Sequence, residues 1–354
     1  MKHIKDIIIQ LFTGANVATI LLLWMSCGVT YLHPESVPKL MLLTYAFPAF
    51  LLVNVAFVLF WLVFKIKRTW IPVVGIAACW SFVRDYYPLN FPAQPSAKAL
   101  KVLTYNTHGF GGSTAIDSLG QNAVCAYLKA CDADIICLQE SYGSKPSGFK
   151  QEMEQLGYEC IDMQNNMLFS RLPVLSADTL TRWPYPNIGI QAWLQHEGDS
   201  ILLFNVHFES NHLSPEMKQA YRNSIKSMEQ DSLRRGLIPV AQLLAAAAPI
   251  RAAQADTLAT LIDQYAAACP ILVCGDFNDT PISYSHRVLT RSLHSAFRQS
   301  GQGLGFSFHE HGFPVRIDHI LYSPSYFSSA DTKVLTDVPW SDHYPVMTTL
   351  SISK

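Results

Sequence analysis

Two long stretches without a charged residue lie within the first fifth of the chain. No Asp, Glu, Lys or Arg occurs between Asp6 and Glu35, and Leu40–Phe64 is also uncharged. A helix rises 1.5 Å per residue, so each stretch exceeds the roughly 20 residues that cross a ~30 Å hydrocarbon core. Buried core helices are rarely apolar on every face over such a length. The sequence therefore predicts two membrane-spanning helices, at about 7–31 and 40–64.

A third apolar stretch is shorter. Thr69–Val83 is uncharged, and Arg84, Tyr86 and Tyr87 follow it. These residue types anchor helix ends at a membrane interface. The stretch lacks the face rich in Lys or Arg that an interfacial helix would need. We therefore expect a third span at about 69–87, which gives an N-terminal bundle of about three transmembrane helices within residues 1–87.

Basic residues predict the orientation of these helices. Two lysines precede the first span and three basic residues follow the second, whereas the loop between the spans contains only Lys39. The excess of positive charge places the N-terminus in the cytoplasm. If the third stretch crosses the membrane, everything after about residue 90 is extracytoplasmic, and we expect this arrangement. If the stretch lies on the interface, the remainder of the chain is cytoplasmic.

Prolines mark the end of the apolar region. Pro88, Pro92 and Pro95 indicate an extended linker at 88–96, and residues 97–354 are expected to form a separate catalytic domain. That domain has 19 Lys and Arg against 24 Asp and Glu, a net charge of −5. Neutralisation of phosphates supplies most non-specific affinity for nucleic acids. The negative charge therefore weighs against a protein that coats nucleic acid.

Short apolar strands alternate with helices in this domain. Candidate strands are Leu100–Tyr105, Ile135–Gln139, Met167–Ser170, Gly189–Gln195, Ile201–His207, Ile271–Cys274, Ile317–Tyr322 and Met347–Ile352. Candidate helices are Asn122–Ala130, Gly148–Leu156 and Pro215–Ala267, the last broken near Gly236–Pro239. Continuous apolar strands imply sheets that are covered on both faces. We predict an α/β fold of two packed mixed β-sheets flanked by helices, a four-layer sandwich.

Polar side chains occur at the ends of six of these strands. They are Asn106, Glu140, Asn205 with His207, Asp276 with Asn278, Asp318 with His319, and Asp342 with His343. A single pair of this kind is usually a solvated turn. Six apolar strands that each deliver a polar group predict a catalytic or metal site at one edge of the fold.

Taken together, these motifs resemble those of the endonuclease/exonuclease/phosphatase superfamily over roughly residues 99–351. The motifs are Tyr-Asn106, Leu-Gln-Glu140, Asn205-Val-His207, Gly-Asp276-Phe-Asn278, Arg-Ile-Asp318-His-Ile and Ser-Asp342-His343. The resemblance implies the two-sheet sandwich and a requirement for Mg²⁺, with Mn²⁺ as a substitute. It also implies a hydrolase that cleaves a phosphodiester or phosphomonoester by in-line attack of an activated water.

The proposed metal ligands follow from the chemistry of Mg²⁺, which prefers oxygen donors and binds through one or two carboxylates. Glu140 is the best candidate, and Asn106 and Asp342 are expected to be ligands or to orient a ligand. Candidate contacts to the substrate are Asn205, Arg171 and His108.

The resemblance implies catalytic roles for five further residues. Asp276 would activate or hold the nucleophilic water, and Asn278 would orient that water and a phosphoryl oxygen. His343 would stabilise charge on the non-bridging oxygens, and Asp318 would fix its tautomer. His207 would stabilise or protonate the leaving oxygen.

The substrate remains open at this stage. Membrane anchoring and the negative charge favour a membrane-associated or small phosphoester, whereas the resemblance to deoxyribonucleases favours DNA or RNA. A catalytically inactive domain that binds phosphorylated ligands is the alternative from another class. The expected partners are the substrate and the lipid bilayer, and the sequence implies no protein partner.

Two segments near the motifs also have open interpretations. The helical insertion at 213–268 is either a helical pair packed on a sheet or a cap that selects substrate or faces the membrane, with Arg234, Arg235 and Arg251 available for anions. The aromatic residues Phe308 and Trp340 are candidates for an apolar rim near the site.

Overall fold

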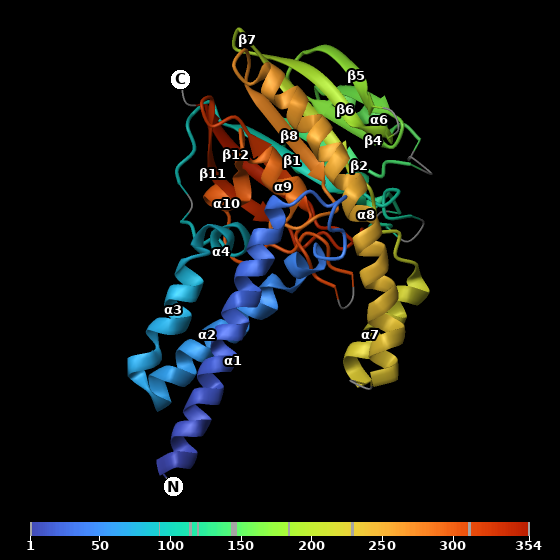
Figure 1. Ribbon diagram of the computed structural model, residues 1–354. Helices are drawn as coiled ribbons and strands as arrows, with labels where there is room; N and C mark the ends of the chain where they lie inside the picture. The colour runs from blue at the N-terminus through green and yellow to red at the C-terminus, as the bar shows by residue number, and fades with distance from the viewer. Residues whose placement is uncertain are drawn as a thin grey trace.

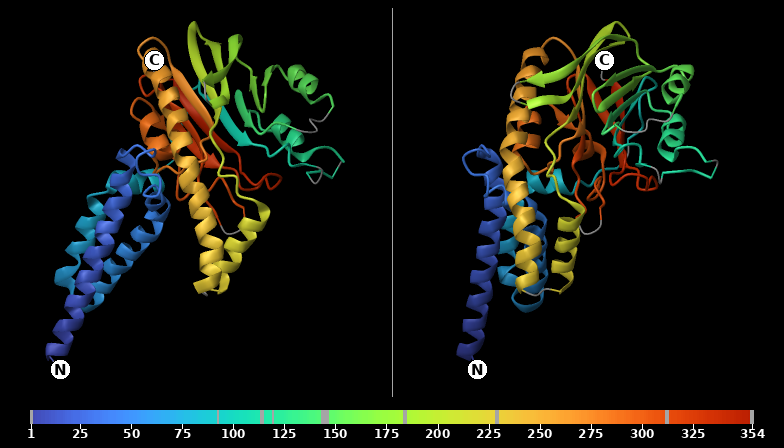
Figure 2. Two further views of the ribbon diagram at one scale, coloured as in Figure 1. Left: turned by 45° about the vertical axis from the view of Figure 1, so that its right-hand side comes forward. Right: turned by 90° about the vertical axis from the view of Figure 1, so that its right-hand side faces the viewer.

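The computed structural model describes residues 2–91, 93–112, 115–118, 120–142, 147–182, 185–227, 230–310 and 313–352. Helices from the N-terminal region project from one end of a two-sheet domain, and a second helical hairpin, α7 and α8, projects on the same side (Figures 1 and 2). The C-terminus lies at the opposite end of the molecule from the N-terminus.

The first two helices agree with the predicted spans. They are α1, Lys2–Gly28, which continues into a short 3₁₀ turn, and α2, Leu42–Phe64. By length and composition both can cross a membrane. In place of one continuous third helix the structure has α3, Trp70–Ala77, and α4, Trp80–Tyr86. The expected third span is therefore divided, and neither half alone has the length of a span.

Close packing joins α3 to α1. Gly75 faces Ile20, and a Cβ at Gly75 would lie 2.7 Å from the Ile20 Cγ1 atom. The indole Nε1 of Trp24 donates a hydrogen bond to the carbonyl of Gly75 at 2.8 Å. A side chain at position 75 would push the two helices apart, so glycine is required at this contact.

Two six-stranded sheets form the rest of the molecule, in the order β11-β12-β1-β2-β4-β3 and β5-β6-β7-β8-β10-β9. The first contains β11 (Phe327–Val334), β12 (Val346–Ile352), β1 (Leu100–Asn106), β2 (Ile135–Gln139), β4 (Asn166–Ser170) and β3 (Glu159–Met163). The second contains β5 (Val174–Arg182), β6 (Tyr185–His196), β7 (Asp199–His207), β8 (Ile271–Asp276), β10 (Asp318–Tyr322) and β9 (His294–Ser295). Every predicted strand is present, and β3, β5, β9 and β11 are additional.

Helices cover the outer faces of both sheets. The first sheet carries α5 (Ala123–Ala130) and α6 (Phe149–Gln155), and the second carries α8 (Gln230–Tyr265) and α9 (Tyr284–Leu289), with α10 (Ala296–Ser300) near its β9 edge. A central core of strand residues such as Val102, Cys137, Leu203 and Cys274 fills the space between the sheets. The predicted four-layer sandwich is therefore confirmed.

The predicted break near Gly236–Pro239 is wrong. Helix α7, Pro215–Ser227, ends earlier, and both Gly236 and Pro239 lie inside α8. A Cβ at Gly236 would lie 1.8 Å from the Ser224 Oγ atom, so glycine there allows α7 to pack closely on α8. Gly236 therefore does not end a helix; it lies where α7 and α8 are in close contact.

The C-terminal half of α8 is part of the domain core. Ala255, Leu258 and Ile262 are buried against Phe204 of the second sheet. Although Arg234–Tyr265 is long and apolar enough to cross a membrane, this burial accounts for much of its apolar character.

Polar contacts join the N-terminal helices to the domain. Arg298 forms an ion pair with Asp85, and the guanidinium of Arg316 donates to the carbonyls of Asp85 and Tyr86. Burial lowers the pKa of Arg316 to about 9, although Tyr86 and Asp85 oppose this shift. Arg287 lies over the ring of Tyr31 at 3.5 Å from its centroid. The helices are thus fixed against the second sheet and its helices.

The segment between the two parts also contacts the domain. Asn90 Nδ2 donates to the carbonyls of Arg298 and Gly301 at 3.0 and 2.9 Å, and the Ala93 amide donates to the carbonyl of Ala330. The predicted linker is therefore extended but bound along the domain surface, which limits motion between the two parts.

Candidate active site

Strand register brings the predicted polar residues to one edge of the sandwich. β1 and β2 run parallel, with Asn106 opposite Gln139, and β7 and β8 run parallel, with His207 opposite Asp276. In the antiparallel neighbour β10, Asp318 lies opposite Asp276. The carboxyl ends of the four parallel strands therefore meet where the two sheets face each other.

Asn106 connects the two sheets at this edge. Its Nδ2 donates to Glu140 Oε1 at 3.1 Å and to Asp276 Oδ2 at 3.0 Å. Its Oδ1 accepts a hydrogen bond from the His108 amide. Because all of these groups are used, Asn106 holds one carboxylate of each sheet at a defined separation.

His343 and Asp318 form a buried pair beside Asp276. His343 Nδ1 lies 2.8 Å from Asp318 Oδ2, and its Nε2 lies 3.7 Å from Asp276 Oδ2. Burial opposes a charged imidazole, but the carboxylates of Asp318 and Asp276 outweigh it and raise the pKa of His343 to about 10. The imidazole is therefore a cation at neutral pH that can stabilise an anionic phosphoryl group.

Asp276 has the properties of a proton acceptor. Burial and the neighbouring Asp318 raise its pKa to about 6, although His343 and His207 oppose the shift. Its Oδ1 accepts a hydrogen bond from the Asn278 amide at 2.8 Å. A carboxylate with a pKa near neutral pH suits a general base.

Three residues of this edge have left-handed backbone conformations. The φ angles are 45° at His108, 50° at Glu140 and 50° at Asn278. Positive φ is unfavourable for residues other than glycine and is often retained where function needs it. The side chain of Asn278 is fixed by a hydrogen bond that its Nδ2 donates to the carbonyl of Phe208.

Glu140 and Asp342 both lie against His108 and line the same edge. His108 Nδ1 lies 3.4 Å from Glu140 Oε2 and 3.8 Å from Asp342 Oδ1, so the two carboxylates flank one imidazole nitrogen. Burial would raise the pKa of Glu140, but hydrogen bonds from His108, Asn106 and Tyr142 and the charge of His207 lower it to about 2. A pair of carboxylates is a donor set that fits Mg²⁺.

A second set of possible ligand atoms lies deeper. Atoms of Asp276, Asp318 and His343 lie within 4.8 Å of one another, and all three side chains are buried. This set includes a nitrogen donor, and Asp318 already accepts the hydrogen bond of His343. It therefore fits Mg²⁺ less well than the pair of Glu140 and Asp342.

His207 lies on the other side of Glu140. Its Nε2 is 3.7 Å from Glu140 Oε1 and 3.8 Å from Asp276 Oδ2, and it is buried without a hydrogen-bond partner among the described residues. A buried polar atom without a partner is costly and indicates a group that contacts a ligand.

Two of the predicted substrate contacts lie elsewhere. Asn205 is buried between the sheets. Its Oδ1 accepts a hydrogen bond from Gln139 Nε2, and its Nδ2 donates to the carbonyls of Leu138 and Met167. Arg171 forms an ion pair with Asp132 at 2.7 Å, at the opposite end of β2, and has no part in this edge. His108 is the one predicted substrate contact that the structure places there.

The other sequence candidates have mixed outcomes. The ring of Phe308 contacts His343 edge to face, with centroids 5.0 Å apart, whereas Trp340 packs against Tyr127. Arg251 is fully buried and pairs with Asp279, so it is not available to an anion from solvent.

A hollow opens at this edge of the fold. Its lining includes the predicted residues Glu140, Asp276, Asn278, Asp342 and His343. It also includes Tyr45 of α2, Lys218 of α7, and Phe313, which the sequence analysis missed. No local motif marks these three residues, because they belong to segments that are remote from the strand ends in sequence.

The adjacent Tyr142, whose hydroxyl donates to Glu140 at 3.0 Å, was missed although it follows the motif glutamate by two positions.

Comparisons with known proteins were made for the whole chain. A family model described as "Endonuclease/Exonuclease/phosphatase family" matches residues 103–343, and a "Domain of unknown function (DUF8431)" matches residues 9–86. No curated protein matches the chain.

Solved structures with the same fold share little sequence. The catalytic domain of human nocturnin with bound sulfate is 17% identical, with a TM-score of 0.50, over 73% of this chain and 97% of that chain. An endonuclease/exonuclease/phosphatase family protein from Bacteroides thetaiotaomicron is 19% identical, with a TM-score of 0.49, over 73% and 98%. Truncated TDP2 from Caenorhabditis elegans is 16% identical, with a TM-score of 0.49, over 73% and 100%.

The family match covers more than half of the chain and includes the motif residues from Asn106 to His343. The chain belongs to the endonuclease/exonuclease/phosphatase family and is a hydrolase that acts on phosphoric ester bonds.

Proposed function

We propose that the protein is a membrane-anchored, divalent-metal-dependent phosphoesterase that cleaves a phosphodiester or phosphomonoester by in-line attack of water. The observation that carries this proposal is the meeting of Glu140, Asp276, Asn278, Asp342 and His343 around one hollow. The set combines a carboxylate pair, a carboxylate with a raised pKa and a cationic imidazole, which are groups that suit phosphoester hydrolysis.

Glu140 and Asp342 would hold Mg²⁺, or Mn²⁺ as a substitute, and Asn106 would orient Glu140. When bound, such an ion neutralises charge on the phosphate and lowers the barrier to attack by an oxygen nucleophile. The left-handed backbone at Glu140 supports this role, because it turns the carboxylate out of the strand end toward Asp342 and His108.

Asp276 would accept the proton of the attacking water, and Asn278 would orient that water. His343 would donate hydrogen bonds to the non-bridging oxygens, with Asp318 holding its ring. These oxygens gain charge during the reaction, so a preorganised cation lowers the barrier. His207, on the far side of Glu140 from His108, would protonate the leaving oxygen or stabilise its charge.

The test uses the full-length protein in detergent with methyl p-nitrophenyl phosphate and p-nitrophenyl phosphate as small substrates. We expect turnover with Mg²⁺ or Mn²⁺ and its loss in excess EDTA. Activity that does not depend on metal would contradict the proposal. So would Mg²⁺ binding in a calorimetric titration without turnover of any small ester, oligonucleotide or phospholipid, since that result indicates an inactive binding domain.

The catalytic domain is proposed to be extracytoplasmic. Helices α3 and α4 return the chain from the far end of α2 to the domain, on which α4 packs (Figure 1). This path supports a crossing by the third apolar stretch. An alkaline phosphatase fused after Ser96, which is active only outside the cytoplasm, should be active. An inactive fusion with a fluorescent cytoplasmic reporter at the same junction would place the domain inside.

A further inference from the structure

Three hollows adjoin one another between the catalytic edge and the first turns of α2. The first is the catalytic hollow described above, and Phe313 lines all three. Lys218 lines the first and second hollows, and Tyr221 and Val240 line the second and third. Tyr45 and Val315 line both the first and the third hollow, so these two adjoin directly, and the three together are called the α2–α8 groove from here on.

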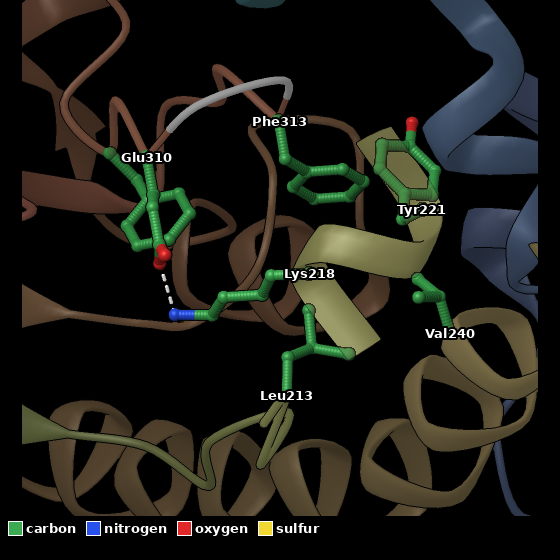
Figure 3. Close-up of a pocket in the computed structure, with 7 residues that line it drawn as sticks. Leu213, Lys218, Tyr221, Val240, Glu310 and Phe313 are labelled. Atoms are coloured by element: carbon green, nitrogen blue, oxygen red, sulfur yellow. Dashed lines mark hydrogen bonds and ion pairs between the residues drawn. The ribbon is translucent and has the colours of Figure 1, made fainter. Parts of the chain in front are cut away.

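The chemistry of the groove changes along its length. The catalytic end presents carboxylates and His343, and the middle contains the ion pair between Lys218 and Glu310. Figure 3 shows Tyr221, Val240 and Phe313 around this middle part, beside Lys218 and Glu310. Beyond that pair the walls are mostly apolar, as the side chains Leu42, Pro48, Leu237, Val240, Leu244 and Pro314 show.

The apolar end lies against a helix that can cross a membrane. Leu42, Tyr45 and Pro48 belong to the first two turns of α2, and α7 and α8 supply the facing wall. This end has a volume of about 390 Å³, within the range of ligand pockets. A hydrocarbon chain that enters beside α2 would therefore lie in this end and meet the catalytic hollow at Tyr45, Phe313 and Val315.

We infer that the α2–α8 groove binds the hydrocarbon chain of a membrane phospholipid while the phosphate lies beside Asp276, Asn278 and His343. This inference names the substrate class of the proposed phosphoesterase and rests on that function. Water would add to phosphorus as one P–O ester bond breaks, and its proton would pass to the leaving oxygen. The observation that carries the inference is that the mostly apolar hollow beside α2 adjoins the hollow that His343 lines, through shared walls at Tyr45, Phe313 and Val315.

The charge of the groove argues against a nucleic acid. Strand-binding channels need several Lys or Arg side chains along the backbone path. Among the described residues that line the three hollows, Lys218 is the only Lys or Arg, and Glu310 neutralises it. A phospholipid needs only one phosphate site and an apolar wall.

The first experiment uses the wild-type full-length protein in nanodiscs. Phosphatidylcholine, phosphatidylglycerol and phosphatidic acid are each supplied with two butanoyl or two hexanoyl chains, below the critical micelle concentration. Burial of added methylenes should raise kcat/KM at least about tenfold for the longer chains of one head group. Equal values for both chain lengths, or cleavage of a single-stranded oligonucleotide without cleavage of any phospholipid, would overturn the inference.

A pair of variants tests the location of the chain. Ala241 lines the apolar end and Ala246 is exposed on the same helix outside the groove. Ala241→Phe should lower the ratio of kcat/KM for the hexanoyl lipid to that for methyl p-nitrophenyl phosphate at least about tenfold, because the ring occupies volume that the chain needs. Ala246→Phe should leave the ratio unchanged, and equal ratios for the two variants would overturn the assigned position.

Methyl p-nitrophenyl phosphate separates the two proposals. If the protein hydrolyses methyl p-nitrophenyl phosphate but its activity on phospholipids does not depend on their chain length, only the lipid-binding role of the groove is refuted. Its failure to turn over in the wild-type protein with metal, together with failure of every lipid and of the oligonucleotide, refutes the phosphoesterase function itself.

Discussion

Asn106 and Asp276 lie 170 positions apart, yet Asn106 Nδ2 donates a hydrogen bond to Asp276 Oδ2 at 3.0 Å between the two sheets. The same amide holds Glu140 at 3.1 Å. One neutral side chain therefore separates the carboxylate proposed to hold the metal from the carboxylate proposed to accept a proton.

Asn106→Asp tests this arrangement with almost no change in shape. A third carboxylate would replace two donated hydrogen bonds by repulsion between like charges, and it would raise the pKa of Asp276 further. We expect kcat to fall by about 10²-fold at neutral pH, comparable with loss of one catalytic hydrogen-bond donor. Steady-state kinetics with methyl p-nitrophenyl phosphate measures the change, and an unaltered kcat would show that Asn106 serves only as structure.

Glu140→Gln should separate metal binding from catalysis. The variant keeps the size of the side chain but removes the charge that Mg²⁺ requires from a ligand. The Mg²⁺ concentration that gives half of the maximal activity should rise at least about tenfold. Glu159→Gln, a substitution on an exposed residue of β3, is the matched control and should leave that concentration unchanged. A Glu140→Gln variant with the wild-type metal requirement would remove Glu140 from the metal site.

His343→Ala should lower kcat. The imidazole is positioned by Asp318 and lies beside Asp276, so its loss removes a preorganised cation and a hydrogen-bond donor. A transition-state donor contributes about 10²–10³-fold to kcat, so a loss of that size is expected at saturating Mg²⁺. Asp318→Asn should cause a smaller loss, because the imidazole remains but its charge is no longer supported. A His343→Ala variant with the wild-type rate would refute the assigned role.

The strand ends could be read from the sequence because each motif is local. Asn106, Glu140, Asp276 and His343 all follow or precede an apolar run, and the parallel pairing of neighbouring strands then brings them together. Strands β3 and β11 were missed because they lie at the two edges of the first sheet and are only partly buried, so neither is a continuous apolar run.

The α2–α8 groove could not be predicted in the same way. Its walls come from Tyr45, Tyr221, Val240 and Phe313, which the sequence places in unrelated segments. The break between α7 and α8 was misplaced because Gly236 was interpreted as a helix breaker, whereas the contact with Ser224 explains it. Contacts between distant helices depend on packing geometry that no short pattern encodes.

The pair of Arg251 and Asp279 connects the segment that follows β8 to α2. Arg251 Nε lies 3.5 Å from Asp279 Oδ2, its Nη2 donates to the Tyr45 hydroxyl at 3.3 Å, and Tyr45 donates to Asp279. Arg251→Met would leave Asp279 buried without its cation, which costs about 3–5 kcal/mol of unfolding free energy. Tyr45→Phe removes the two long hydrogen bonds of the hydroxyl and should cost less, about 1–2 kcal/mol.

Chemical denaturation of the full-length protein in detergent, followed by tryptophan fluorescence, measures both changes. Equal and small effects of the two variants would show that the pair contributes little to stability. A large effect of Tyr45→Phe alone would instead assign the stabilisation to α2 packing.

Two buried histidines should make the protein sensitive to acid. Burial and the nearby charges of Arg316 and Arg298 lower the pKa of His286 to about 3, and burial with His286 and Arg316 lowers the pKa of His319 far below its ordinary value. Unfolding restores a pKa of about 6.5, so below that pH the unfolded state binds more protons. The free energy of unfolding should therefore fall as the pH drops from about 6.5 toward 3, by up to about 1.4 kcal/mol per pH unit for each histidine.

Replacement of His286 isolates its share of this acid sensitivity. The His286 Nε2 is buried and has no hydrogen-bond partner among the described residues, so His286→Phe removes a titrating group without breaking a bond at that atom. The difference in unfolding free energy between pH 6.5 and pH 5 should shrink by about 2 kcal/mol in this variant. His212→Gln, at an exposed position, is the control. If His286→Phe and the wild-type protein lose the same stability between these pH values, His286 is already protonated in the folded state and its burial does not set the acid response.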